Sequence, residues 1–168
     1  MKLARLVDGI ALDHDIIKST LLEDLAFEKA TKAAYRLDWA LAESIIKQGR
    51  NVIIDSTCNY PEILDQGTAL AQQYGYEYWY IECKVDNIDL LDERLRERIP
   101  LRSQRTGVNL PPADASSVSG GEDYRALFKR WIENPCRPDR NVIIVDSTGN
   151  IEKRLQDILE QIYSATGV

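Results

Sequence analysis

Two short runs of β-branched residues, far apart in the chain, share almost the same letters and the same flanks. Arg-Asn-Val-Ile-Ile-Asp-Ser-Thr occupies residues 50–57, and Arg-Asn-Val-Ile-Ile-Val-Asp-Ser-Thr occupies residues 140–148. Continuous apolar runs of this length are typical of strands covered on both faces, as in parallel sheets between layers of helices. We therefore interpret the two copies as strands of one parallel sheet that lead into similar turns.

Long amphipathic stretches separate these runs from two further strand candidates. Besides 51–55 and 141–145, the pattern predicts strands over 9–12 and 77–84. Helices are predicted over the stretches 16–48 (broken where Asp24 reads as a cap), 61–74, 87–98, 124–133 and 151–163. This alternation predicts an α/β fold of three layers, with a parallel sheet between helices on both faces.

Length and composition limit what such a chain can be. The 168 residues are enough for one well-packed domain, which we expect to span 1–168. A net charge of −6 argues against bulk nucleic-acid binding and against binding to anionic membranes. Three widely spaced cysteines and one histidine predict neither a disulfide framework nor a metal site. No apolar run approaches the length of a membrane span, and we expect a cytoplasmic protein.

Polar residues follow the predicted strands at their carboxyl ends, where open α/β sheets bind ligands. Asp15 comes after the first strand, and Lys18 follows one helical turn later. A carboxylate in this place can accept the proton of a substrate hydroxyl, and the lysine can hold an anionic group. The alternative is that Asp15 simply caps the helix, because aspartate is a favoured N-cap residue.

A second group of polar residues follows the strand 51–55. Asp55 and Asn59 lie between this strand and the predicted helix, where they can position a hydroxyl substrate. Ordinary turn and capping chemistry is the alternative interpretation. Cys58 lies between them without a nearby base, and we interpret it as structural.

Arginines gather where the helix 87–98 meets a long segment without periodicity. Arg94, Arg98 and Arg102 are spaced to share a helix face, and Arg105 follows. Such a cluster can clamp phosphate, although a solvated face balanced by nearby carboxylates explains it as well. The segment 99–121 is rich in proline, glycine and serine, and we expect a lid or substrate loop there.

Taken together, these segments resemble the P-loop kinases of the zeta-toxin, chloramphenicol-phosphotransferase and polynucleotide-kinase group. ALDHDIIKS is similar to a strand and motif that imply Asp15 as catalytic base and Lys18 as a substrate contact. QGRNVIIDSTCNYPE implies Asp55 and Asn59 near the acceptor, and LDERLRERIPLRSQR resembles the lid. The resemblance implies ATP and Mg²⁺ as cofactors, and the lid arginines as phosphate ligands: Arg98, Arg102 and Arg105.

The phosphate-binding signature of that group, GxxxxGK[ST], is not present in the printed sequence. None of the nine glycines is followed by lysine. Residues 2–6 resemble the helix that follows the signature, so the first, central strand of the family order 2-3-1-4-5 is missing as well. Ile53 and Ile81 are then expected on the two sides of a gap, unless the flanking strands close up or another segment or chain fills it.

Two classes of function follow from this resemblance. The first is an ATP-dependent phosphotransferase acting on a small-molecule or nucleotide hydroxyl, impaired by the missing signature. The second is a non-catalytic kinase-like interaction or regulatory protein. Such a protein could form a homodimer that covers the open edge of the sheet. A gene product shortened at its start is a further explanation.

Overall fold

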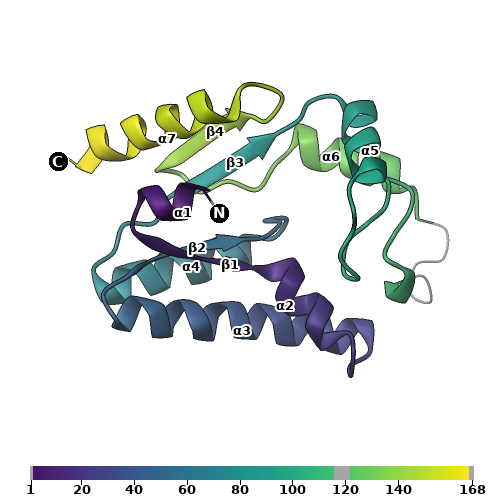
Figure 1. The fold of residues 1–168 in the computed structure, drawn as a ribbon, viewed down its shortest axis with the longest axis horizontal. Helices are drawn as coiled ribbons and strands as arrows, with labels where there is room; N and C mark the ends of the chain where they lie inside the picture. The colour runs from purple at the N-terminus through teal and green to yellow at the C-terminus, as the bar shows by residue number, and fades with distance from the viewer. Residues whose placement is uncertain (1, 116–121, 167–168) are drawn as a thin grey trace.

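A computed structural model gives the fold and describes residues 2–115 and 122–166 (Figure 1). The elements in chain order are α1 (Lys2–Leu6), β1 (Gly9–Asp13), α2 (His14–Leu21), α3 (Phe27–Lys47), β2 (Asn51–Asp55), α4 (Pro61–Tyr74), β3 (Tyr80–Lys84), α5 (Ile88–Glu97), the 3₁₀ turn η1 (Ala113–Ala115), α6 (Tyr124–Glu133), β4 (Val142–Asp146) and α7 (Ile151–Thr166). Strands and helices alternate as the sequence predicts, so the α/β class with parallel strands is confirmed.

The four strands form two parallel pairs. Ala11 of β1 lies opposite Ile53 of β2, and Glu82 of β3 lies opposite Ile144 of β4. The sequence predicts strands of one parallel sheet with Ile53 and Ile81 on the two sides of a gap, unless that gap is closed or filled. Among the described residues no strand is hydrogen-bonded between β2 and β3, so each pair keeps a ladder of its own. The three-layer sheet and the missing central strand stay predictions.

Helix α1 connects the two pairs, and Figure 1 shows it between them. It lies against β1 and β2, while Leu3 packs on a core cluster of β4 and α7 that contains Ile143, Val145 and Ile158. An ion pair between Lys2 and Glu152 also joins α1 to α7. Because the helix touches both pairs, it helps to fix where one lies relative to the other.

The predicted helix 16–48 is broken where we expected, although the cap is a different residue. Helix α2 ends at Leu21 and α3 begins at Phe27. The N-cap residue of α3 is Ala26, which makes no side-chain cap, so the capping role predicted for Asp24 is wrong. Since α3 buries its small residues against α2 and the first strand pair, packing rather than capping fixes where it starts.

Helix α4 confirms two local signals in the sequence. Pro61 occupies its first turn, where the missing N–H of proline costs no hydrogen bond. Gly75 follows the last turn with a φ of 72°, a left-handed conformation that glycine adopts without strain.

Strand β3 is shorter than predicted, because pairing with β4 begins only at Tyr80.

Candidate functional site

Asp13 caps helix α2 and thereby places Asp15 in the first helical turn. One Asp13 carboxylate oxygen accepts hydrogen bonds from the backbone N–H groups of Asp15 at 2.9 Å and Ile16 at 3.1 Å. The interpretation of Asp15 as the N-cap residue is therefore wrong. Because the cap is supplied from the end of β1, the Asp15 side chain is left for other contacts at the carboxyl end of that strand.

Both oxygens of the Asp15 carboxylate accept hydrogen bonds from the loop after α5. The Ser103 hydroxyl donates to Oδ1 at 2.7 Å, and the side-chain amide of Gln104 donates to Oδ2 at 2.8 Å. Ser19 lies one turn after Asp15, and its hydroxyl oxygen accepts the backbone N–H of Ser103 at 3.0 Å. Ser103 is only 6% exposed, whereas Asp15, Ser19 and Gln104 are half-buried, so the cluster is partly open to solvent.

A buried pair beneath this cluster anchors the start of α2 to α3. His14 Nδ1 lies 2.6 Å from Oδ2 of Asp38, and the two residues are 7% and 1% exposed. The His14 ring also stacks on Tyr35, with the ring centroids 4.3 Å apart. Because His14 directly precedes Asp15, this pair holds the backbone from which the Asp15 carboxylate projects.

Lys18 lies on the same helix as Asp15, and its charge is partly shielded. Its ammonium group sits over the Phe27 ring, 4.1 Å from the ring centroid. Burial lowers the pKa of Lys18, while the negative charge of Asp15 acts in the opposite direction. The two predicted site residues are therefore close enough to interact electrostatically.

The structure brings Asp55 to the same edge, next to the end of β1. Asp55 pairs with Asp13 in the strand register. Burial raises the pKa of Asp55, and the charges of Asp13 and Asp15 raise it further. Asn59 lies in the loop between β2 and α4, half-buried. The carboxyl edge of the first strand pair is therefore acidic.

The three predicted phosphate-binding arginines all have partners within their own region of the chain. Arg98 donates to the carbonyl of Arg105 at 3.0 Å, and Arg102 binds the Asp114 carboxylate with two bonds of 2.9 and 2.8 Å. Arg105 donates to the carbonyl of Val108 at 3.0 Å, and its guanidinium lies 4.1 Å from the Tyr124 ring centroid. These contacts stabilise the loop. The helix face expected to extend from Arg94 stops at Glu97, where α5 ends.

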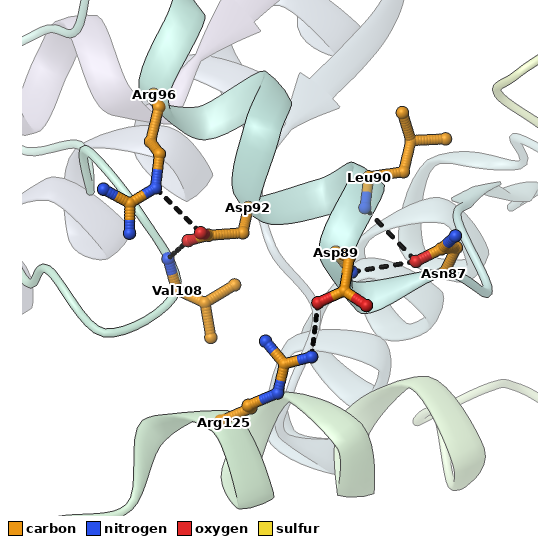
Figure 2. A network of polar contacts seen from close by, with 7 residues as sticks. All are labelled: Asn87, Asp89, Leu90, Asp92, Arg96, Val108 and Arg125. Atoms are coloured by element: carbon orange, nitrogen blue, oxygen red, sulfur yellow. Dashed lines mark hydrogen bonds and ion pairs between the residues drawn. The ribbon is translucent and has the colours of Figure 1, made fainter.

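Helix α5 is itself fixed by a polar network, shown in Figure 2. Asn87 caps the helix by accepting the N–H groups of Asp89 and Leu90. Asp89 pairs with Arg125 of α6, while Asp92 accepts hydrogen bonds from the Arg96 side chain and the Val108 N–H. The loop is thus bound to α5 and α6 as well as to α2. Residues 116–121 of the predicted lid lie outside the described residues.

Two of the clefts between described residues lie away from Asp15. One of about 970 Å³ runs between β4 and α7, and one of about 490 Å³ lies beside the end of β3 and α6. Neither is lined by Asp15. Within the ranges 2–115 and 122–166, no three His, Cys, Asp or Glu side chains are placed to hold a metal ion. None of the helices described there is long and apolar enough to span a bilayer.

Sequence reasoning gave no role to several residues of this site, which are Asp13, His14, Ser19, Asp38, Ser103 and Gln104. A signal for the buried pair was present, because Asp38 interrupts a stripe of alanines spaced four residues apart at 30, 34 and 42. An acid on a buried helix face needs a partner, and the chain has one histidine. For Ser103 and Gln104 the loop sequence carries no periodic signal that assigns contacts.

Comparison with known proteins gives one match. A family model described as an AAA domain matches residues 2–111, which is more than half of the 168-residue chain. The matched region contains Asp15 and its partners in the loop after α5. The search of curated proteins and the search of solved structures find no match.

Proposed function

The chain belongs to the AAA domain family, and we propose that it is a phosphotransferase-like domain whose acceptor is a hydroxyl group and whose general base is Asp15. The family assignment indicates a P-loop kinase-like, nucleotide-binding domain. The choice of a hydroxyl acceptor comes from the site itself. The subgroup of zeta-toxin-like, chloramphenicol-phosphotransferase-like and polynucleotide-kinase-like enzymes remains our proposal for its nearest functional relatives.

One observation carries this proposal: a hydroxyl group already donates to the Asp15 carboxylate at 2.7 Å, the distance that proton transfer to a base requires. That hydroxyl belongs to Ser103, and it shows the carboxylate in the role of acceptor toward an alcohol. Each carboxylate oxygen can accept more than one hydrogen bond, so the site can also receive the hydroxyl of a substrate.

The other residues of this edge take roles around the acceptor. Lys18 can hold an anionic group of the substrate, because its ammonium lies beside Asp15 and is poorly hydrated. Asp55 and Asn59 would orient polar groups of the acceptor from the end of β2. Arg98, Arg102 and Arg105 remain candidates for phosphate binding, because a guanidinium carries five N–H donors and the bonds described above use only some of them.

The phosphate-binding signature of the family is the part of the site that would hold ATP. The printed sequence has no glycine followed by lysine to cradle the phosphates. On the acceptor side of the reaction, Asp15 would bind and orient a hydroxyl and take up its proton.

A non-catalytic kinase-like protein is the second candidate function. It is favoured by the edges of β2 and β3 that carry no partner strand in the described part of the chain, since a parallel pair with an open edge can receive another strand. In that case the chain would act through binding, as a regulatory or interaction domain, and a homodimer is one form it could take. This candidate predicts a stable fold that does not respond to nucleotide.

Mg-ATP distinguishes the two candidates. For the phosphotransferase we expect Mg-ATP to raise the melting temperature, since a ligand at 100 times its Kd adds about 2.7 kcal/mol of stability. We also expect ATP consumption that Asp15→Asn abolishes and that Asp65→Asn, an exposed carboxylate on α4, leaves unchanged. Absence of both binding and turnover at millimolar Mg-ATP would overturn the catalytic proposal and leave the binding protein.

A further inference from the structure

The loop after α5 is an ordered structure with internal bonds of its own. Arg102 holds Asp114 through two hydrogen bonds, and the N–H of Val108 donates to Asp92 of α5 at 2.6 Å. Val108 is only 1% exposed. This loop follows α5, and α5 and α6 contact one another beyond the end of β3 (Figure 1).

The same loop is joined to helix α2, in the first half of the chain, by a compact set of hydrogen bonds. Ser103 and Gln104 contribute the hydroxyl and the amide on Asp15, at 2.7 and 2.8 Å. The Ser103 hydroxyl also lies 3.1 Å from the Asp15 carbonyl oxygen, and Ser19 bonds Ser103. Asp15 is the charged member of this set, and bonds to a charged group are the stronger ones.

We propose that Asp15 is the clasp of a lid: its carboxylate holds residues 101–105 against α2 through Ser103 and Gln104, and the lid opens when a different donor takes over the carboxylate. The clasp follows from the geometry of these side chains alone. The further statement that an acceptor hydroxyl is the donor that opens it rests on the proposed function.

The pattern of donors makes the clasp specific for a carboxylate at position 15. Ser103 offers an O–H and Gln104 offers an N–H, and an ionised carboxylate accepts both. An asparagine at this position has one oxygen and one NH₂ group, so it can accept only one of the two donors in the present geometry, and neither bond keeps the strength that the charge of the carboxylate gives. Conversely, a glutamate at position 104 would face the Asp15 carboxylate, and like charges repel.

The two substitutions combined should restore the bond with its direction reversed. In Asp15→Asn/Gln104→Glu, the amide introduced at position 15 can donate to the carboxylate introduced at position 104, while the Ser103 hydroxyl keeps its acceptor. The contact from the Leu101 N–H to the side-chain oxygen of residue 104 is kept as well. The charge of the chain does not change, because one carboxylate moves from position 15 to position 104.

Hydrogen exchange at the backbone amides of residues 101–105 measures the clasp directly. We expect Asp15→Asn and Gln104→Glu each to accelerate this exchange by about tenfold or more, as for the loss of a bond to a charged group. The double variant should return to within a few-fold of the wild type. Ser103→Ala should accelerate exchange too, since it removes the second donor.

Matched controls on exposed residues separate the clasp from general changes in stability. Gln72→Glu on α4 makes the same chemical change as Gln104→Glu, and Asp65→Asn makes the same change as Asp15→Asn. Both controls should leave exchange at residues 101–105 unchanged. Equal exchange in the wild type and both single variants, or a double variant as open as the single ones, would overturn the proposal.

The double variant also separates the clasp from catalysis. Its lid should be closed, but position 15 no longer carries a carboxylate base. If exchange is restored while ATP turnover is absent and the wild type turns over ATP, both proposals hold. If the wild type shows no turnover but the exchange pattern is as expected, the proposed function fails and the clasp stands.

Discussion

The Ser103 hydroxyl lies 2.7 Å from Oδ1 of Asp15, although 88 positions of sequence separate the two residues. This contact joins the end of the first strand pair to the loop that follows α5. It joins Asp15, which the sequence predicts as a site residue, to Ser103, for which the sequence predicts no role. The site therefore depends on how the two halves of the chain meet as much as on either half.

The buried pair beneath the site should be necessary for stability. Asp38→Ala leaves His14 without its partner at 2.6 Å in an interior position, and an unsatisfied buried polar group costs about 1–3 kcal/mol. We expect the free energy of unfolding in urea to fall by about that amount. Asp24→Ala, an exposed aspartate outside the helices, serves as control and should be neutral. Equal stability of the two variants would contradict the role of the pair.

Asp55 should make the fold less stable at neutral pH than an uncharged residue would. Its pKa is raised in the folded state, by burial first and by Asp13 and Asp15 next, whereas the unfolded chain has the ordinary value. The unfolded state therefore ionises more readily, and stability falls as pH rises through the folded pKa.

We accordingly expect Asp55→Asn to raise the melting temperature at pH 7. The gain should shrink as pH falls through the raised folded-state pKa toward the ordinary value of 3.8. It should vanish below 3.8, where the wild-type carboxyl group is neutral in both the folded and the unfolded state. A gain that stays constant with pH would show that ionisation is not its cause.

Cys58 should be a poor nucleophile. Burial, followed by the neighbouring Cys136, raises its pKa to about 11. At pH 8 about one thiol in a thousand is then ionised, and the thiolate is the reactive form. We expect iodoacetamide to modify Cys58 about 100-fold more slowly in the folded protein than in urea, as followed by peptide mass spectrometry. Rapid modification of folded Cys58 at pH 8 would contradict this.

Gly67 should resist substitution even though it lies inside a helix. A Cβ atom there would come within 2.5 Å of the Tyr78 ring, a ring from the segment that leads into β3. The gain in helix propensity from Gly67→Ala is about 1 kcal/mol, and overpacking costs about 1–3 kcal/mol. We expect a net loss of stability, partly recovered in Gly67→Ala/Tyr78→Leu. A more stable single variant would show that the ring moves aside freely.

Much of the fold could be read from local patterns. The strand that ends at Asp55 and the helix that begins at Pro61 are where the sequence predicts them, because β-branched runs and proline at N1 act within a few residues. The site edge also followed from such patterns: parallel strands end on the same side, so Asp15 and Asp55 had to lie near one another. The family match over residues 2–111 agrees with the resemblance at the level of the P-loop class.

The remaining features depend on contacts between distant segments. Asp13, and not Asp15, caps α2. Which of the two aspartates is the cap depends on the residue at which the helix starts, and local propensity predicts that residue only to within a few positions. Arg102 pairs with Asp114 inside a loop that has no period, so its sequence could not distinguish a structural arginine from a phosphate ligand.

Strands β2 and β3 each use one backbone edge for a ladder and leave the other without a strand partner in the described structure. The backbone N–H and C=O groups on those unpaired edges must then be satisfied by water or by side chains. Such contacts hold two segments together less firmly than a ladder of strand hydrogen bonds does. The two halves of the molecule are therefore held together across the line between Ile53 and Ile81 by the packing of α1 and by the loop after α5, and not by a strand ladder.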